Sequence, residues 1–369
     1  MTGKGKWGRA VSAMAALSAV AALTAGCSTG TASNSANSAL NSLPTNFGPP
    51  EKTVLNVGVV PAMDSAGFFI AMNDGLFTKE GLTIKYTPAV SSETAVAQQL
   101  KGKLDISAGN YVSYINEAAL DHQPIEIVAE GSVMQQGAQV IFTMPGSKIK
   151  SLSQLKGQML GVNAPGNIDY LLDVSVLQEN GINPKSVDFP SAKDPAFASQ
   201  GGAIPFPDMA QDLADGKIAA ATMPEPFASI AEQEYGAVPL ADLNQGATTD
   251  FPIEGYVVTK QWQEQNPNTL KRFLAALEVG QEIADTDRAA VEQAFEARAL
   301  GSPANGQVPP SIAAVMALDT YPIGVDQTRI QRVANVMYQF GLLKSEFNVK
   351  SMVLPSSFFN FSQFSSSGS

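Results

Sequence analysis

The stretch that decides the fold is VLNVGVVPAMDSAGFFIAMNDGLFTKEGLTIKY, residues 54–86. It begins with an apolar run that predicts a buried strand, and a small polar loop then leads into a helix over GFFIAMN. Gly75 ends that helix, and LTIKYTPA, residues 82–89, predicts a second strand. A strand, a helix and another strand in this order form a βαβ unit, which joins parallel strands of one sheet.

The same alternation continues along the chain. After the second strand, Ser92 is expected to cap a helix, LDISAGN predicts a third strand, and PIEIVAEGS predicts a fourth. A second series of strands and helices follows the run GAQVIFTMPGS and includes MLGVNAPGN and NPKSVDFP as strands. From about residue 260 the pattern is mostly helical. The fold class expected is therefore α/β, with two successive series of alternating strands and helices.

The first 26 residues are typical of an export signal. Lys4, Lys6 and Arg9 form a basic start, and an alanine-rich apolar run then ends in small residues before Cys27. A secretory signal peptide explains this order, and a single N-terminal anchor helix is the alternative. The residues LTAGC, 23–27, resemble a bacterial lipobox, whose cysteine takes a diacylglycerol. Residues 27–52 are rich in small polar residues and predict a flexible tether.

Charge and cysteine usage narrow the class of protein. The net charge is −11, so the chain is a poor partner for nucleic acid or for anionic lipid headgroups. Cys27 is the only cysteine, which excludes a disulfide within the chain. We therefore expect the chain to contact a membrane only through a lipid on Cys27. We also expect it to be a monomer.

No familiar catalytic or metal centre is indicated. His122 is the only histidine and no G-x-S-x-G elbow is present, which argues against a serine hydrolase. One histidine and one cysteine cannot supply a zinc site, and neither a phosphate-binding glycine loop nor a calcium loop is present. We expect no cofactor and no catalytic residue. A hydrolase built on two carboxylates stays open, because such a site needs no sequence motif.

Four small polar loops stand where a strand leads into a helix. In open α/β sheets, ligands bind at this edge, beside the helix N-termini. Ordinary turn chemistry explains any one such loop, but four in corresponding places favour a cleft between two lobes. The side chains expected to bind a ligand are Asp64, Ser65, Asn110, Tyr111, Asn167, Asp169, Tyr170 and Glu225.

An ordered set of segments resembles one family. These are GFFIAMNDGLFTKEGLTIKY (67–86), QLKGKLDI (99–106), SLSQLKGQMLGVNAPGN (151–167), LADGKIAAATMPEPFAS (213–229) and EGYVVTKQWQEQNPNTLKRFLAAL (254–277). Together they resemble the solute-binding lipoproteins of ABC importers for aliphatic sulfonates, taurine, nitrate and thiamine precursors. The resemblance covers residues 53–280, with weaker similarity to about residue 345.

The resemblance implies a type II periplasmic-binding fold. Lobe I would comprise residues 53–140 and 253–350, lobe II residues 141–252, and residues 351–369 a C-terminal tail. Two hinge strands, GAQVIFTM and EGYVVTK, would join the lobes, which would close on a solute. The closed form would dock on a membrane permease driven by an ATPase.

The loops depart from what an anion-binding member needs. They contain no lysine or arginine, while Asp64, Asp169, Glu225 and Glu254 are acidic. A cleft lined by these carboxylates and by Tyr111 and Tyr170 would favour a neutral or cationic nitrogenous solute, such as a pyrimidine. An oxyanion such as a sulfonate, taurine or nitrate is the alternative. An enzyme related to pyrimidine synthases, and a lipoprotein that presents ligand to another partner, also remain open.

Overall fold

The computed structural model describes residues 47–297, 307–355 and 358. The predicted signal peptide, the lipidation site at Cys27 and most of the predicted tether lie outside these residues. Within the described part, no helix combines the length and the apolar character that crossing a membrane requires.

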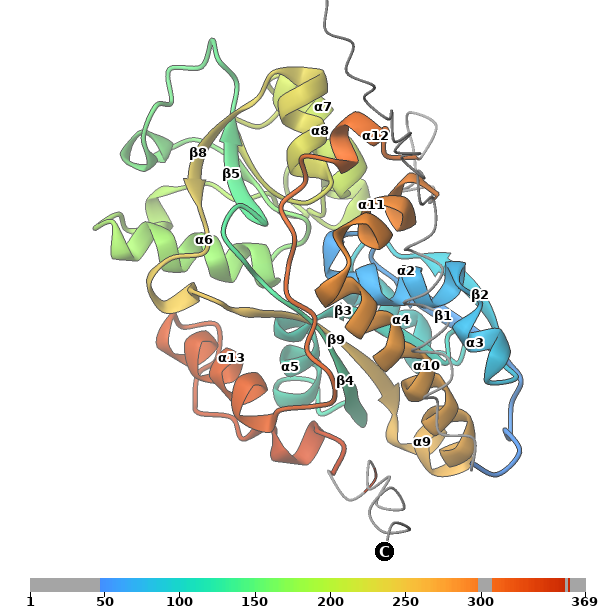
Figure 1. Cartoon of the computed structure of the whole chain (residues 1–369). Coiled ribbons are helices and arrows are strands. Elements are labelled where there is room, and N and C mark those ends of the chain that lie inside the picture. Colours follow the sequence, from blue (N-terminus) through green and yellow to red (C-terminus); the bar gives the residue numbers. More distant parts are fainter. Residues whose placement is uncertain (1–46, 298–306, 356–357, 359–369) are drawn as a thin grey trace, which may run out of the picture.

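Two β-sheets organise the chain, and we call each sheet with the helices against it a lobe (Figure 1). The sheet of lobe I has the strand order β2-β1-β3-β9-β4, and that of lobe II has the order β6-β7-β5-β8. The strands of lobe I are β1 Val54–Val59, β2 Thr83–Pro88, β3 Ile106–Asn110, β4 Ile125–Val133 and β9 Pro252–Thr259. Those of lobe II are β5 Gln139–Thr143, β6 Leu160–Gly161, β7 Ala220–Pro224 and β8 Val238–Asp242.

The βαβ unit predicted from the opening stretch is present. β1 pairs in parallel with β2 and with β3, and the apolar side chains of β1 at positions 55, 57 and 59 are buried. Gly75 lies at φ 69°, a left-handed conformation that glycine adopts without a side-chain clash, and separates α2 from α3. The first helices are η1 Met63–Ser65, α2 Ala66–Asn73, α3 Leu76–Lys79, α4 Ser92–Leu100 and α5 Tyr111–Ala119.

Helices also cover the sheet of lobe II. The helix after PGN is α6, and Asn167 caps it by accepting a hydrogen bond from the Tyr170 amide. The structure differs from the expected strands here: MLGVNAPGN contributes only the two residues of β6, and NPKSVDFP contributes one bridge, Met159 to Asp188. The helices of this region are η2 Leu152–Leu155, α6 Ile168–Glu179, η3 Pro184–Ser186, η4 Ala198–Gln200, α7 Phe206–Ala214, α8 Phe227–Tyr235 and η5 Gly246–Thr248.

The helical C-terminal third packs mainly on lobe I. α10 crosses α2 at a close approach where Gly280 lies against the backbone of Gly67, and α13 packs on α5. Between α11 and α13 the chain reaches lobe II, where α12 packs on α8. Residues 314–326 then return to lobe I (Figure 1). These helices are α9 Lys260–Gln265, α10 Pro267–Thr286, α11 Arg288–Glu296, α12 Pro310–Ala313, α13 Gln327–Gln339 and η6 Val349–Met352.

The two expected hinge strands belong to different sheets. β5 pairs with β7 and β8 in lobe II, whereas β9 pairs with β3 and β4 in lobe I. The chain therefore passes between the sheets in the segments 134–138 and 243–251, close to the predicted lobe boundaries. Arg332 of α13 donates hydrogen bonds to the carbonyl oxygens of Ala247, Thr249 and Asp250, which anchors the second crossing on lobe I.

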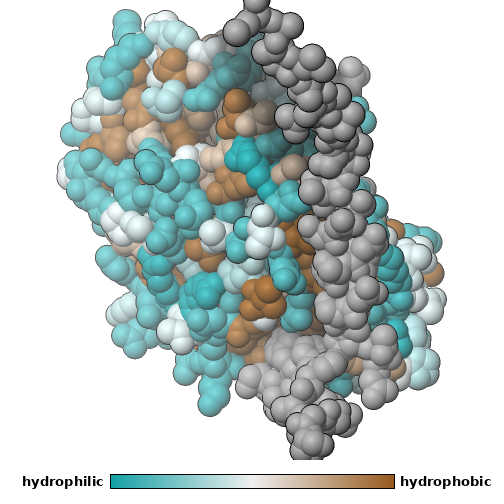
Figure 2. Space-filling model, in the orientation of Figure 1, coloured by the Kyte–Doolittle hydropathy of each residue, from teal (hydrophilic) through white to brown (hydrophobic). Residues whose placement is uncertain are grey.

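The lobes lie in direct contact with each other. The amide of Met63 donates to the carbonyl oxygen of Glu225 at 2.8 Å, and Asn163 Nδ2 donates to the Val90 carbonyl oxygen at 3.1 Å. Figure 2 shows mainly hydrophilic residues on the visible face of the surface, with hydrophobic residues in small groups. Ligand sites in proteins often lie where two domains meet, so we look for one between the lobes.

Candidate functional site

A small polar cavity lies between the lobes at the starts of α5 and α6. Its volume is about 20 Å³, which is room for roughly one water-sized group. Lobe I contributes Val60, Asp64, Ser92, Gly109, Asn110, Ile253 and Glu254. Lobe II contributes Gln139, Asn163, Asn167, Ile168, Asp169 and Phe206. We call this space the inner pocket.

Two side-chain amides at the inner pocket, those of Asn110 and Asn163, donate to the protein itself. Asn110 Nδ2 donates to Ser92 Oγ at 2.9 Å, and Asn163 Nδ2 donates to the carbonyl oxygens of Val90 and Ile204. The side chain of Asn167 is hydrogen-bonded to Asp169 as well as capping α6. Few donors are therefore left for a solute.

Two buried acceptors of the pocket have no partner. Asp169 Oδ1 and Gln139 Oε1 are both without a hydrogen bond, although both side chains are buried. The other oxygen of Asp169 accepts from the Asn163 amide at 2.9 Å. A buried acceptor without a partner costs free energy, so a solute that donates to these two oxygens would be stabilised. None of the described residues that line the pocket is lysine or arginine.

Asp169 is poised to change its charge near neutral pH. Burial raises the pKa of its carboxyl group to about 7, although hydrogen bonds from the Asn163 amide and the Asn167 side chain favour the ionised form. Asp169 also lies in the first turn of α6, where its carboxylate interacts favourably with the positive end of the helix dipole. The N-terminus of α6 is consequently less available to a second anion.

Three more carboxyl groups form a buried cluster beside the pocket. Asp64 accepts a hydrogen bond from Ser132 Oγ at 2.9 Å and is hydrogen-bonded to Asp319, while Ser65 Oγ donates to Glu254. Burial first, and then the neighbouring acids, raise the pKa of Glu254 and Asp319 well above the ordinary values, and burial raises that of Asp64. Two carboxyl groups that bond each other share a proton, so this cluster loses its protons at higher pH than exposed carboxyl groups do.

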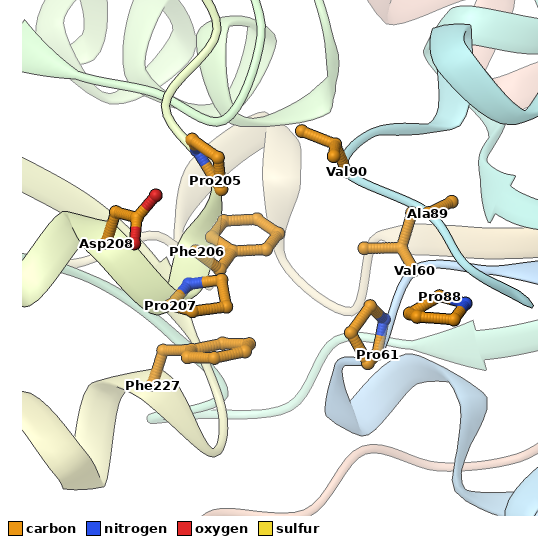
Figure 3. Close-up of a pocket in the computed structure, with 10 residues that line it drawn as sticks. All are labelled: Val60, Pro61, Pro88, Ala89, Val90, Pro205, Phe206, Pro207, Asp208 and Phe227. Carbon is orange, nitrogen blue, oxygen red and sulfur yellow. The ribbon is translucent and has the colours of Figure 1, made fainter. Parts of the chain in front are cut away.

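A larger and apolar space adjoins the inner pocket. Its volume is about 220 Å³, and Val60 and Phe206 line both spaces. Figure 3 shows Phe206 and Phe227 on one side, facing Val60 and Pro61 on the other. The remaining lining residues are Pro88, Ala89, Val90, Pro205, Pro207 and Asp208. We call this space the outer cavity.

The comparison with protein families settles the relationship of the chain. Residues 48–298 match the model of the NMT1-like family. The chain belongs to the NMT1-like family. This match includes both sheets, all the residues that line the two spaces, and helices α2 to α11.

Individual relatives of this NMT1-like chain are distant. It is 25% identical over 281 residues to the nitrate/nitrite binding protein NrtA of Nostoc, covering 70% of this chain and 60% of that protein. It is 26% identical over 129 residues to a putative thiamine biosynthesis protein of Haemophilus influenzae, which is 34% of this chain and 38% of that one. The chain thus spans less than two thirds of the length of each of these relatives.

A solved structure confirms the expected fold. The periplasmic nitrate-binding protein NrtA from Synechocystis PCC 6803 superposes with a TM-score of 0.69 and 16% identity. The superposition covers 85% of this chain and 89% of that protein. At this identity the likeness establishes the fold, two α/β lobes of the periplasmic-binding type, and leaves the solute to be argued from the site.

The structure brings four of the eight predicted site residues together. Asp64, Asn110, Asn167 and Asp169 line the inner pocket. Ser65 does not line the pocket itself, but its hydroxyl donates to Glu254, which does. Glu254 is one of the four acids expected near the loops.

The other three predicted residues lie elsewhere. Tyr111 is fully buried under Gly255 in lobe I, and Tyr170 packs edge to face on Phe189 with ring centroids 4.8 Å apart. Glu225 bonds Ser229 and the Ala317 amide, and burial raises its pKa to about 7. None of the three is among the residues that line either space.

Several residues of the site were missed by sequence reasoning. Ser92 was expected to cap α4, but Ser91 is the cap, since its side chain accepts from the Thr94 amide. Ser92 Oγ instead accepts from Asn110 inside the cleft. The doublet of serines could have raised the possibility that only one is a cap. Nothing in the sequence pointed to Gln139 or Phe206.

Proposed function

We propose that the chain is the extracytoplasmic solute-binding component of an ABC import system. It would capture a small nitrogenous solute between its lobes and deliver it to a membrane permease, without transforming it. Membership of the NMT1-like family, the periplasmic-binding fold and a site enclosed by both lobes support this proposal. The hinge closure that such proteins use would be supplied by the two crossing segments.

One observation carries the choice of solute class. The inner pocket holds two unpartnered buried oxygens, Asp169 Oδ1 and Gln139 Oε1, while the side-chain amides of Asn110 and Asn163 donate to protein groups. A solute with N–H groups satisfies both oxygens, whereas an oxyanion would add further acceptors to them. A cationic N–H donor gains in addition from the charge of Asp169.

An oxyanion is the second candidate, and two observations favour it. The relatives named above include two nitrate-binding proteins. The cluster of Asp64, Glu254 and Asp319 also retains protons, and a protonated carboxyl group donates a hydrogen bond.

The sign of the pH dependence separates the two candidates. A cation binds the ionised form of Asp169, whose pKa in the free protein is about 7, so binding releases a proton and affinity rises from pH 5.5 to 8.5. An oxyanion held by protonated acids would instead lose affinity as rising pH ionises those acids. Isothermal titration calorimetry in two buffers of different ionisation enthalpy reads both the affinity and the number of protons released.

A thermal-shift screen provides the first test of the proposal. The mature chain is heated with primary amines, amidines, pyrimidines, nitrate and ethanesulfonate, each in excess. A solute at 100 times its dissociation constant adds about 2.7 kcal/mol to the free energy of unfolding, which is readily seen as a higher Tm. Stabilisation by nitrogenous compounds but not by anions is expected, and the reverse pattern would replace the proposal with the second candidate.

The cellular setting remains part of the proposal. Export by the signal peptide, a lipid anchor on Cys27 at the outer face of the cell membrane, a monomeric state, and a permease with its ATPase as partner all follow from the resemblance and the N-terminal sequence. A presenting or sensing lipoprotein would use the same site. Labelling of the intact cell with radioactive palmitate, with Cys27→Ala as control, tests the anchor.

A further inference from the structure

The outer cavity offers a second place for the solute that the proposed function does not use. It is about ten times larger than the inner pocket, 220 against 20 Å³, and shares Val60 and Phe206 with it. The inner pocket has room for one small polar group only. A solute that places such a group there must put the rest of its body in the outer cavity.

The walls of the outer cavity are apolar and come from both lobes. Val60, Pro61 and residues 88–90 face Phe206 and Phe227 across the space (Figure 3). The two phenylalanine rings are stacked, with centroids 5.5 Å apart and planes 21° from parallel. The one charged lining residue, Asp208, lies on the far side of these rings from the space in Figure 3.

These walls are also stiff. Four of the lining residues are prolines, whose backbone dihedral φ is restricted by the ring, so each wall keeps its shape when the lobes close on a solute. An apolar space of this kind gains free energy when apolar surface leaves water to enter it. Polar bodies, such as sugars or carboxylates, would lose hydrogen bonds with water there and gain none.

We propose that the outer cavity is an apolar subsite, and that the solute is an amphiphilic organic cation. One ammonium group would occupy the inner pocket, and a compact aliphatic or aromatic body would lie between Phe206 and Val60. This inference rests on the proposed function, because it takes the inner pocket as the polar end of the site.

A homologous series of probes tests the subsite. Methylammonium, n-propylammonium, n-butylammonium and benzylammonium chlorides are titrated at pH 8 into the mature chain. We expect affinity to rise about fourfold for each added methylene until the cavity is filled. Affinity that stays constant along the series, with methylammonium binding retained, would overturn the subsite while leaving the proposed function intact. Binding of nitrate with no binding of any ammonium probe would overturn both.

Two variants localise the effect. Phe206→Ala and Phe227→Leu are expected to weaken n-butylammonium and benzylammonium binding about tenfold or more, and Phe227→Leu, which alters the outer cavity alone, should change methylammonium binding little. Phe189→Leu, which alters the contact with Tyr170 outside both spaces, is the matched control. Two variants are used because Phe206 is buried in the core, and a melting curve of each shows that it is folded. Equal losses for all probes, or none in either variant, would contradict the assignment.

Discussion

Asp169→Asn is expected to weaken binding of a cationic solute about 30-fold or more at pH 8. Removing one partner of a buried, hydrogen-bonded charge pair costs about 2 to 5 kcal/mol, and the lower figure corresponds to that factor. Asparagine keeps an oxygen that can accept from the Asn163 amide, so the start of α6 should keep its local structure. Isothermal titration calorimetry with the best probe from the screen measures the loss.

The same substitution should raise the stability of the ligand-free protein at pH 8. Burial raises the pKa of Asp169 from 3.8 to about 7 in the folded state. The folded protein therefore holds more protons than the unfolded chain between these values, and this contribution to stability is lost as pH rises through 7. The neutral asparagine has no such loss, so its Tm should exceed that of the native chain by several degrees at pH 8 and by little at pH 4.

Glu278→Gln is the matched control for this pair of effects. Burial also raises the pKa of Glu278 to about 7, but the residue lies on α10 and lines neither space. It should share the gain in Tm at pH 8 and leave affinity unchanged. Native affinity in Asp169→Asn would show that the inner pocket is not where the solute binds.

Gly280→Ala is expected to lower the free energy of unfolding by about 1 to 2 kcal/mol. Alanine in a helix interior is by itself better than glycine by about 1 kcal/mol. A Cβ atom at this position, however, would lie 2.1 Å from the carbonyl oxygen of Gly67, a backbone atom that cannot rotate away. The two helices would have to separate, and overpacking of this kind typically costs 1 to 3 kcal/mol or more.

The displacement should reach the ligand site. α2 follows directly from the turn that carries Asp64 and Ser65, so moving α2 away from α10 also moves the acid cluster. Gly146→Ala is the control, because a Cβ atom there meets nothing within 4 Å. Chemical denaturation measures both variants, and a Gly280→Ala protein more stable than the native chain would show that helix propensity outweighs the close approach.

Much of the scaffold was predictable because it depends on local patterns. β1, α2 and β2 follow from an apolar run, a helical run and a glycine that takes a left-handed φ, all within one short stretch. Where the pattern was weaker, prediction was poorer. β6 has only two residues, because Pro165 and Gly166 turn the chain soon after it begins.

The ligand site was only partly predictable. Loops at the ends of strands indicated Asp64, Asn110, Asn167 and Asp169, since parallel strands place these ends at one edge. The same rule also selected Tyr111 and Tyr170. It states where a loop lies, but it does not state into which space each side chain of the loop points.

The sequence by itself determined the family, the two-lobed α/β fold and an acidic cleft, because these follow from short periodic runs and from the types of residue in the loops. The tertiary structure alone decided that Asp319 joins Asp64, that Gln139 Oε1 and Asp169 Oδ1 have no donor, and that Phe206 lies between a polar pocket and an apolar one. Each of these depends on contacts between segments far apart in the chain, whose distance and orientation are set by the packing of the lobes and leave no local pattern in the sequence.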